Sequence, residues 1–375
     1  MRNVLERIWQ KTAARNTLTP FEKLIFCLLC LLEPLYRAGF FIAACYRKKT
    51  GNKPVPFKVI SVGNLSVGGT GKSVVVSFLG NLLAPHAPAI VLRGYGGSIA
   101  KQGTNLMVSD SKNLLCGAEM SGDEAFMLAQ SFTGPVVVGP DRLRSCQLLE
   151  AWAKKTGNTV KTVILDDAYQ NYKILKNIEI LLLDARKPFD NAHTLPAGKL
   201  REKDYRRAHF FFLTHASQVS TSFLQSIKTD MLIGVDQKCI FAGKHAYAGA
   251  FLDNAGSDQT KILFGRACLL VAGIGSISGF EQTVSDAGLV RADTLEFPDH
   301  HAYSEHDLET IEKRAHDIQC FVVATTAKDW VKLQPLVQEK KYRVRWYVVR
   351  VTFAFLQTHD EQRFSHALAK LLDHS

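Results

Sequence analysis

A short apolar strand, a glycine-rich loop and an apolar helix follow one another between residues 57 and 83. The strand covers Phe57–Val62, the loop ends in Gly68-Gly69-Thr70-Gly71-Lys72-Ser73, and the helix begins at Val74. Glycines let successive backbone N–H groups turn toward a phosphate, and the partial positive charge of a helix N-terminus attracts the same anion. The arrangement is typical of a P-loop. It predicts an α/β fold in which a parallel sheet carries a nucleotide site.

Each residue of the loop receives an expected role from this pattern. Lys72 is expected to reach the β- and γ-phosphates, and the Ser73 hydroxyl to bind Mg²⁺. Ser66 replaces the first glycine of the usual pattern. The backbone groups expected to surround the phosphates belong to Ser66, Val67, Gly68, Gly69, Thr70 and Gly71. The segment Thr326-Ala327-Lys328-Asp329 lacks the Asn/Thr-Lys-x-Asp spacing of GTP-specific proteins, which favours ATP.

Two acidic pairs further along the chain are candidates for metal binding and proton transfer. The β-branched run Thr162–Leu165 ends in Asp166-Asp167, as a Walker-B strand does, and places carboxylates where they could bind the metal. Asp123-Glu124 opens an apolar helix after Gly122. Acids at that position are ordinary helix caps. A kinase also needs a carboxylate that accepts the proton of the acceptor hydroxyl, so both interpretations of Asp123-Glu124 remain open.

The net charge of +11 is concentrated near the N-terminus. Residues 1–58 contain 11 basic and 3 acidic residues, whereas the remaining chain contains 35 basic and 32 acidic ones. A nucleic-acid-binding protein would need basic residues across a large face of its main body. The uneven distribution therefore argues against nucleic acid and favours an anionic membrane surface as the partner of the N-terminal segment.

The N-terminal segment is apolar over Leu24–Tyr46, which is long enough to span a bilayer. Glu33, Pro34 and Arg37 interrupt it, and charges in the middle of a membrane are costly. The interruption predicts two shorter helices that lie in the interface of an anionic membrane, flanked by clustered lysine and arginine. A buried helical hairpin and a true membrane span are the alternatives.

The rest of the chain alternates between strand-like and helical stretches. The strand-like runs are Ala89–Leu92, Val136–Val138, Thr162–Leu165, Ile178–Leu183, Phe210–Thr214, Ala267–Val271, Phe321–Thr325 and Trp346–Val351. The alternation predicts a doubly wound parallel sheet of the P-loop NTPase type followed by a second α/β domain. The expected boundaries are 1–50 for the membrane segment, 51–205 for the P-loop core and 206–375 for the second domain. Residues 238–252 are expected to form a β-hairpin, and residues 361–372 a closing helix.

A series of motifs along nearly the whole chain resembles the tetraacyldisaccharide 4′-kinase family, which phosphorylates a lipid A precursor. Besides the P-loop, the matching segments are Arg93-Gly94-Tyr95-Gly96, Ser121-Gly122-Asp123-Glu124, Val138-Gly139-Pro140-Asp141-Arg142, Leu165-Asp166-Asp167-Ala168-Tyr169-Gln170, Leu195-Pro196-Ala197-Gly198-Lys199-Leu200-Arg201-Glu202, Phe297-Pro298-Asp299-His300-His301 and Thr325-Thr326-Ala327-Lys328-Asp329. P-loops are common, but this combination in this order is specific.

The resemblance implies transfer of the γ-phosphoryl group of ATP to the 4′-hydroxyl of an acylated glucosamine disaccharide 1-phosphate. It implies that Asp123 is the general base, paired with His300, and that Lys72 is catalytic. The metal ligands for Mg²⁺ would be Ser73, Glu124, Asp166 and Asp167, and the substrate or phosphate contacts Arg93, Tyr95, Arg142, Asn171 and Arg201. It also implies a location on the cytoplasmic face of the inner membrane, a hairpin that acts as a lid or linker, and no obligate protein partner.

Two departures from the family pattern affect individual roles. Ala168-Tyr169-Gln170-Asn171 replaces the more usual Gly-Phe-Gln-His, so Asn171 can form hydrogen bonds but cannot titrate. Ala125 replaces the proline that often follows the two acids. Two functions of other classes remain as alternatives: a P-loop switch ATPase that cycles on and off membranes, and an ATPase stimulated by nucleic acid.

Overall fold

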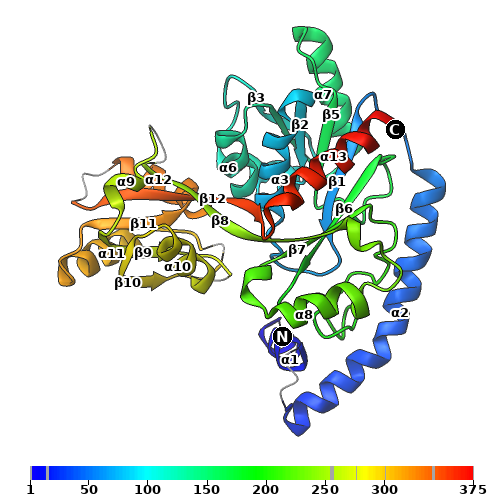
Figure 1. Cartoon of the computed structure of the whole chain (residues 1–375), viewed down its shortest axis with the longest axis horizontal. Coiled ribbons are helices and arrows are strands. Elements are labelled where there is room, and N and C mark those ends of the chain that lie inside the picture. Colours follow the sequence, from blue (N-terminus) through cyan, green and yellow to red (C-terminus); the bar gives the residue numbers. More distant parts are fainter. Residues whose placement is uncertain are drawn as a thin grey trace. The chain divides into compact units, whose positions relative to one another are not determined.

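The computed structural model describes residues 2–13, 17–253, 257–275, 277–299, 301–339 and 343–374 (Figure 1). The chain divides into two compact units. Unit 1 comprises Met1–Arg93, Asp141–Lys244 and Phe355–Ser375, and unit 2 comprises Gly94–Pro140 and His245–Ala354. This division differs from the expected split between residues 205 and 206, because each unit is assembled from separate stretches of chain.

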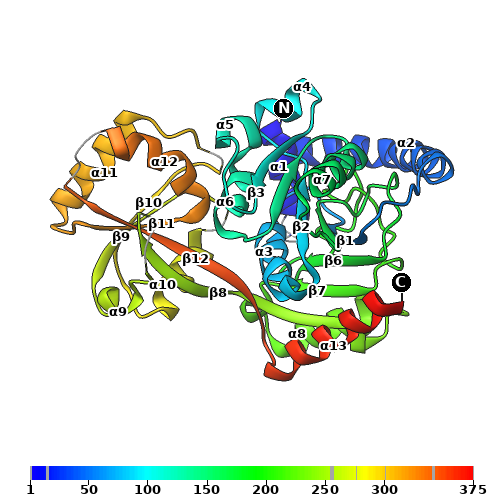
Figure 2. The ribbon, with the colours of Figure 1, turned by 90° about the horizontal axis from the view of Figure 1, so that it is seen from above.

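A parallel sheet forms the centre of unit 1. Its described strands follow the order β8-β7-β6-β1-β5-β2, and Figure 2 shows β1, β6 and β7 in succession. The strands are β1 (Lys58–Asn64), β2 (Pro88–Leu92), β5 (Thr162–Asp166), β6 (Ile178–Asp184), β7 (Phe210–Thr214) and β8 (Ile240–Leu252). Nearly all positions of β1, β2, β5, β6 and β7 are buried and most are apolar, as expected of parallel strands covered on both faces. The strands expected near residues 58, 89, 162, 178 and 210 are confirmed.

Helices of unit 1 cover this sheet. They are α3 (Lys72–Leu82), α7 (Arg142–Thr156), α8 (Thr221–Ser226) and α13 (Thr358–His374), with the shorter turns η1 (Ala84–His86), η2 (Ala216–Gln218), η3 (Ile227–Met231) and η4 (Gln237–Cys239). The expected closing helix is confirmed as α13. Its Phe364 ring lies 4.9 Å from that of Phe212 and 5.3 Å from that of Phe241, centroid to centroid. These aromatic contacts attach the C-terminal helix to β7 and β8.

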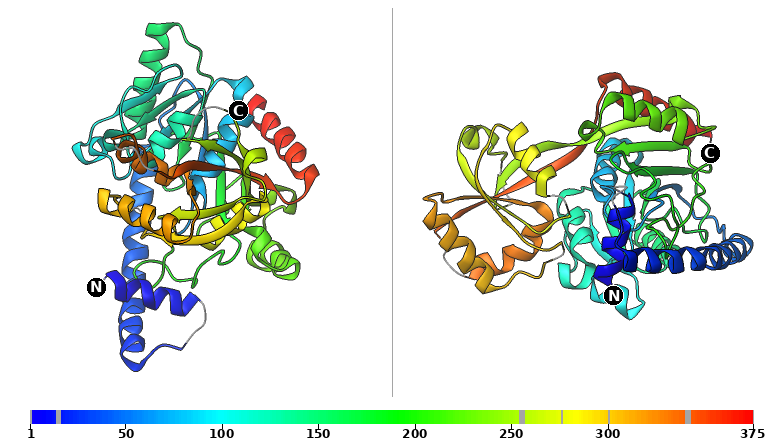
Figure 3. Two further views of the ribbon diagram at one scale, coloured as in Figure 1. Left: turned by 90° about the vertical axis from the view of Figure 1, so that its left-hand side faces the viewer. Right: turned by 90° about the horizontal axis from the view of Figure 1, so that it is seen from below.

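Two helices begin the chain, α1 (Arg2–Ala13) and α2 (Pro20–Thr50) (Figure 3). Thr19 and Glu22 form a capping box that starts α2, and Pro20 occupies its first turn. The expectation of two helices separated near Pro34 is wrong, because α2 continues through Pro34. A proline removes one backbone hydrogen bond, and the remaining bonds of a 31-residue helix preserve its course. By length and composition α2 could cross a membrane, and within the described residues no other helix meets that criterion.

The side chains of α2 divide into two sets. Glu22 and Glu33 are buried against the rest of unit 1. Glu22 forms ion pairs with Arg7 (3.0 Å) and Lys11 (2.8 Å) of α1. The exposed apolar set consists of Phe21, Leu24, Leu28, Leu31, Leu32, Leu35, Phe41, Ile42 and Tyr46, largely at the three- and four-residue spacing of one helix face. The Glu33 carboxylate therefore faces the rest of unit 1 and does not lie on the exposed apolar face of α2.

Unit 2 contains a second group of parallel strands and an antiparallel pair. The parallel strands follow the order β10-β9-β11-β12, and β3 pairs antiparallel with β4. They are β9 (Ala267–Ala272), β10 (Val290–Glu296), β11 (Val322–Thr326), β12 (Arg345–Phe355), β3 (Leu106–Asp110) and β4 (Pro135–Val138). Strand β10 was not predicted, because this edge strand is largely exposed and carries charged residues.

Seven helices of unit 2 are described: α4 (Ser98–Gln102), α5 (Ala118–Ser121), α6 (Asp123–Ser131), α9 (Thr260–Leu263), α10 (Ile277–Asp286), α11 (Glu305–Asp317) and α12 (Ala327–Glu339). The core of this unit includes the Trp330 and Trp346 rings, whose centroids lie 5.8 Å apart. Both tryptophans are almost fully buried, which confirms a core role for them. Helix α12 packs against α6 in the same unit.

The expected β-hairpin over residues 238–252 is wrong, because Ile240–Leu252 is one continuous strand. Its beginning pairs with β7, with Ile240 opposite Phe211. The backbone N–H of Leu356 donates to the Ala242 carbonyl (2.8 Å), and that of Asp253 donates to the Trp346 carbonyl (3.1 Å). These bonds align β8 antiparallel to β12. Gly243 and Gly249, which suggested a turn from the sequence, therefore lie within the strand.

Candidate functional site

The glycine-rich loop connects β1 to α3 in unit 1. Gly71 caps α3 with a φ of 76°, and Gly68 has a φ of 127°, both in the region that favours glycine. No described atom lies within 4 Å of where a Cβ at Gly68 or Gly69 would be, so the loop is open on that side. The Thr214 hydroxyl, at the end of β7, donates to the Thr70 carbonyl (3.1 Å). This hydrogen bond attaches the loop to the end of β7.

Lys72, Asp167 and Arg201 form one charged cluster beside this loop. The Lys72 Nζ lies 3.6 Å from Asp167 Oδ1 and donates to Asn64 Oδ1 (3.2 Å). Arg201 Nη1 donates to both oxygens of Asp167 (3.1 and 3.2 Å) and to Gln170 Oε1 (3.2 Å). Burial by itself would raise the pKa of Asp167, but Lys72 and Arg201 outweigh it and lower that pKa. Asp167 is therefore held as a carboxylate.

Asp166, the last residue of β5, lies beside a buried arginine. Arg142 Nη2 donates to the backbone carbonyl of Asp166 (2.8 Å), and both side chains are buried. Burial lowers the pKa of Arg142 to about 10, with the charges of Asp166 and Asp167 opposing it. Arg142 remains cationic at neutral pH. Its positive charge offsets the repulsion between the neighbouring carboxylates of Asp166 and Asp167 at the end of β5.

Residues 193–203, here called the 193–203 loop, pair with the beginning of the glycine-rich loop. Ser66 and Leu200 form an antiparallel bridge. The Val67 N–H donates to the Lys199 carbonyl (2.8 Å), and the Arg201 N–H donates to the Leu65 carbonyl (2.7 Å). This pairing carries Arg201 to Asp167. It explains physically why the Leu-Pro-Ala-Gly-Lys-Leu-Arg-Glu motif accompanies the P-loop in this chain.

Unit 2 contains the acidic pair at the start of α6. Asp123 Oδ2 lies 3.1 Å from Lys332 Nζ, and Lys332 also donates to the His301 carbonyl (3.1 Å). Lys332 lies on α12, which packs against α6. Gly122 precedes the pair with a φ of 88°. The carboxylate of Asp123 is thus held by a lysine that the sequence analysis did not select, and the expected partner His300 lies outside the described residues.

The remaining candidate residues are less closely associated. The side chains of Arg93 and Tyr95 are exposed, and that of Glu124 is half-buried on α6. Asn171 Oδ1 accepts a hydrogen bond from the Lys173 N–H (3.0 Å), which makes it part of a local turn. Within the described residues no group of three or more His, Cys, Asp and Glu side chains has the arrangement of a metal site.

Sequence reasoning missed Lys332, Thr214 and Gln170 as members of these clusters. Gln170 follows the Walker-B acids directly and was quoted only as part of a motif. Lys332 follows Lys328 by four residues, one helical turn beyond the Thr-Thr-Ala-Lys-Asp segment. That spacing was a usable signal for a second lysine on the same helix face. Nothing in the sequence around Thr214 distinguished it from an ordinary strand residue.

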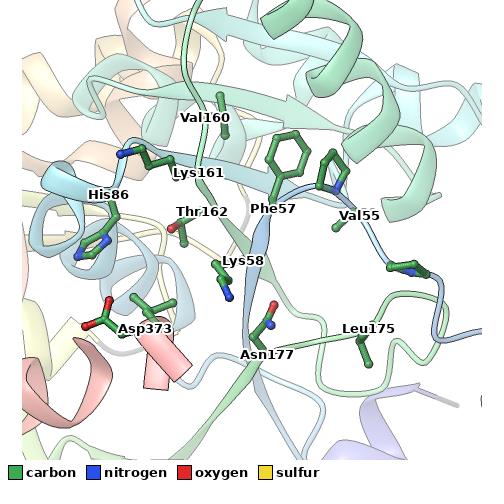
Figure 4. A pocket seen from close by; sticks show the side chains of 13 residues that line it. Val55, Phe57, Lys58, His86, Val160, Lys161, Thr162, Leu175, Asn177 and Asp373 are labelled. Carbon is green, nitrogen blue, oxygen red and sulfur yellow. The ribbon is translucent and has the colours of Figure 1, made fainter. Parts of the chain in front are cut away.

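A cavity of about 550 Å³ lies elsewhere in unit 1 and does not belong to this site. Figure 4 shows Lys58, Thr162 and Asn177 around it, with Asn177 Oδ1 accepting from the Val59 N–H (2.8 Å). Lys58 and Thr162 are the first residues of β1 and β5. The cavity therefore opens at the amino ends of the parallel strands, whereas the glycine-rich loop follows the carboxyl end of β1.

The chain matches the family model of LpxK, tetraacyldisaccharide-1-P 4′-kinase, over residues 24–373. It is 32% identical to the tetraacyldisaccharide 4′-kinase of Syntrophus aciditrophicus over 351 residues, which are 90% of this chain and 91% of that protein. It is 35% identical to the enzyme of the same name from Desulfatibacillum aliphaticivorans over 317 residues, 80% of this chain and 78% of that one.

Its structure is similar to a crystal structure of LpxK from Aquifex aeolicus in complex with ATP. The TM-score is 0.70 at 25% sequence identity, and the match covers 93% of this chain and 99% of that chain. The similarity therefore extends over both compact units.

Proposed function

The chain belongs to the tetraacyldisaccharide-1-P 4′-kinase family of lipid A biosynthesis, and from this premise we propose how its residues divide the work of the reaction. The acceptor is the 4′-hydroxyl of an acylated glucosamine disaccharide 1-phosphate, and the donor is the γ-phosphoryl group of ATP. Phosphoryl transfer depends mainly on alignment and on stabilisation of negative charge. The observation that carries the proposal is the cluster of Lys72, Asp167 and Arg201 beside an open glycine-rich loop.

ATP binds through the backbone of Ser66–Gly71, with Lys72 neutralising charge on its β- and γ-phosphates. The ATP complex of the Aquifex aeolicus relative supports this assignment. Lys72 lies near Asp167 and Asn64, both at the ends of neighbouring strands. A lysine held in place at that edge needs little reorganisation to meet the phosphates.

Mg²⁺ is the metal that suits the oxygen donors proposed as its ligands. Its ligands would be drawn from the Ser73 hydroxyl and the carboxylates of Asp166, Asp167 and Glu124. Hydroxyl and carboxylate oxygens are the donors that Mg²⁺ prefers. When bound, the ion neutralises charge on the phosphates. Asp167 is already engaged by Arg201 and Lys72, so Asp166 is the principal carboxylate in this assignment.

Asp123 accepts the proton of the 4′-hydroxyl, and His300 assists it. The position of Asp123 at the start of α6, in contact with Lys332, supports a fixed orientation of its carboxylate. Lys332 donates to the His301 carbonyl as well, so it links the acid to the segment that carries His300. Proton transfer from the acceptor hydroxyl then coincides with its attack on the γ-phosphorus, as the bond from that phosphorus to the β,γ-bridging oxygen breaks and ADP leaves.

Replacement of Lys332 by methionine is expected to lower kcat by about 10- to 100-fold, because an unheld carboxylate loses the alignment on which transfer depends. Lys332→Arg should retain more activity, since arginine also carries a positive charge. Turnover in detergent-dispersed substrate measures the effect. Lys313→Met, a change at another lysine of unit 2, is the control. Equal turnover in Lys332→Met and the unaltered chain would contradict this role.

Substrate or phosphate contacts come from Arg93, Tyr95, Arg142, Asn171 and Arg201. The exposed Arg93 and Tyr95 are suited to contact the glycolipid directly. Arg142 is buried and donates to the Asp166 carbonyl, so it acts on phosphate through the charge that it places beside the Walker-B acids. Asn171 contributes a hydrogen-bonding side chain within a turn.

The chain attaches to the cytoplasmic face of the inner membrane through α2, with an anionic membrane surface as its partner. Its apolar side chains face away from unit 1, and Arg47, Lys48 and Lys49 lie in its last turn. Such a helix lies in the interface, where apolar residues enter the acyl boundary and cations meet anionic headgroups. Neither a nucleic acid nor an obligate protein partner is required. The glycolipid acceptor resides in the same membrane.

The double substitution Leu28→Ser and Leu35→Ser is expected to weaken binding to anionic lipid vesicles by about 100-fold or more. Moving one leucine side chain from water into the acyl region contributes about 1.5–3 kcal/mol to the binding free energy. Both leucines are exposed on α2. Vesicle sedimentation measures the change. Leu175→Ser alters an exposed leucine elsewhere on unit 1 and serves as the control. Undiminished sedimentation of the double variant would count against attachment through this face.

Transfer of labelled γ-phosphate from ATP to extracted glycolipid, with the product mapped to the 4′ position, tests the proposed reaction. ATP hydrolysis independent of the glycolipid would instead support the membrane-cycling switch ATPase. Stimulation of hydrolysis by DNA or RNA would support the nucleic-acid alternative. Either result without 4′ transfer would overturn the proposal.

A further inference from the structure

Glu33 lies in the middle of α2, yet its side chain is buried and points into unit 1. The 193–203 loop surrounds its carboxylate. The Thr194 N–H and hydroxyl each donate to Glu33 Oε1 (2.9 Å), His193 Nδ1 lies 2.7 Å from Oε2, and Lys203 Nζ lies 3.5 Å from Oε1. A buried carboxylate is stable only when such partners replace water.

The same loop is held at further points by the N-terminal helices. The Tyr36 hydroxyl, one turn after Glu33, donates to the Arg201 carbonyl (3.1 Å). The Trp9 indole N–H donates to the Pro196 carbonyl (3.0 Å). Just before the loop, the Asn191 side-chain amide donates to the Thr12 hydroxyl (2.9 Å). Helices α1 and α2 therefore fix the loop from one side.

On its other side the 193–203 loop pairs with the glycine-rich loop. The Val67 N–H donates to the Lys199 carbonyl, and the Arg201 N–H donates to the Leu65 carbonyl. The Arg201 side chain reaches Asp167. A displacement of the loop would move both the backbone that precedes the phosphate site and the arginine that orients a Walker-B acid. A shift of about 1 Å in such groups can lower catalysis by about 100-fold.

We infer that Glu33 is a positioning residue for phosphoryl transfer, and that through the 193–203 loop it connects the membrane-facing helix to the phosphate site. The inference rests on the proposed roles of Lys72, Asp167 and Arg201. A carboxylate at this position selects one placement of the loop, because other placements leave a buried charge without its donors. The helix thus has two separate tasks: its apolar face meets lipid, and its buried glutamate aligns the active site.

This link is permanent over the neutral pH range. Burial would raise the pKa of Glu33, but hydrogen bonds from Thr194 and His193 and the charge of Lys203 bring it down to about 2. The contribution of Glu33 to stability is present above its unfolded pKa and is lost only as the pH falls toward about 2. The contact is therefore a fixed alignment device rather than a pH switch.

Glu33→Gln in the full-length chain tests the inference with two measurements. Turnover of detergent-dispersed glycolipid should fall about 10- to 100-fold, with the loss mainly in kcat, because the loop and Arg201 are no longer held in one placement. Hydrogen exchange should become faster at the Val67 and Arg201 amides, whose acceptors are the Lys199 and Leu65 carbonyls. The amides of β9 in unit 2 should exchange as before, which distinguishes a local change from general unfolding.

Glu22→Gln is the matched control, since Glu22 is also a buried glutamate of α2 but pairs with α1. It should affect turnover and both amides much less than Glu33→Gln does, because the contact that Glu22 supports reaches the loop indirectly, through α1. Tyr36→Phe removes only the hydroxyl that donates to the Arg201 carbonyl. It should reproduce the Glu33→Gln effect in a smaller form, and it tests the inference even if Glu33→Gln folds poorly. Unchanged exchange at Val67 and Arg201, or unchanged kcat, in Glu33→Gln would overturn the inference. Failure of the underlying site assignment would be seen separately, as normal turnover in Asp167→Asn.

Discussion

Asp123→Asn is expected to lower the turnover number of the kinase by about 100- to 10,000-fold, the usual contribution of a general base, because Asp123 is the residue proposed to take the proton. Asparagine has the shape of aspartate and can still accept a hydrogen bond from Lys332, which lies 3.1 Å from the carboxylate in the unaltered chain. It cannot take a proton from the 4′-hydroxyl. The expected loss is therefore in kcat, with ATP affinity preserved, because ATP is assigned to the glycine-rich loop. Phosphate transfer at saturating ATP, together with equilibrium binding of ATP, measures both quantities.

Glu119→Gln is the control for this experiment. Glu119 is an exposed acid on α5, immediately before α6, so its removal changes the charge of the same region without touching the proposed base. Turnover of Asp123→Asn close to that of the control would show that another group takes the proton. A reduced melting temperature in Asp123→Asn but not in Glu119→Gln would instead indicate that the Asp123–Lys332 pair contributes to folding.

The parts of the molecule that the sequence predicted correctly depend on short-range patterns. The strand before the glycine-rich loop and the strand ending in Asp166-Asp167 both appear where expected, and they are neighbours in the sheet. Runs of β-branched and apolar residues determine such strands almost independently of distant contacts. Parallel strands in turn bring their carboxyl ends to one edge, which places Lys72 near Asp167.

The missed features depend on contacts between residues that are far apart in the chain. Glu33 and Thr194 are 161 residues apart, and nothing near Glu33 in the sequence indicates that its charge is satisfied by a loop. The same charge led to the expectation that α2 would be interrupted. Ile240–Leu252 was expected to turn back on itself because the two partners of β8 cannot be seen in its own sequence. Lys332 was missed because its partner Asp123 lies on another helix.

Alanine at position 72 is expected to lower phosphoryl transfer by about 1,000-fold or more, because it removes the charge aimed at the β- and γ-phosphates in the transition state. The fold should survive the change. Asp167 keeps its two hydrogen bonds from Arg201. The buried Asn64 Oδ1 loses the donor that Lys72 supplies, which costs about 1–3 kcal/mol of stability. Single-turnover transfer from labelled ATP measures the chemical step apart from product release.

Lys58→Ala provides a matched comparison. Lys58 is the first residue of β1, the strand that the glycine-rich loop follows, and it lines the cavity at the amino ends of the parallel strands. Both variants remove one positive charge from the same strand–loop–helix segment. If the effect of Lys72→Ala arose from net charge or from the stability of β1, the two variants would lose similar activity. A loss confined to Lys72→Ala assigns the effect to the end of the strand where the loop is open. Comparable activity in the two variants would contradict the placement of the phosphates at that end.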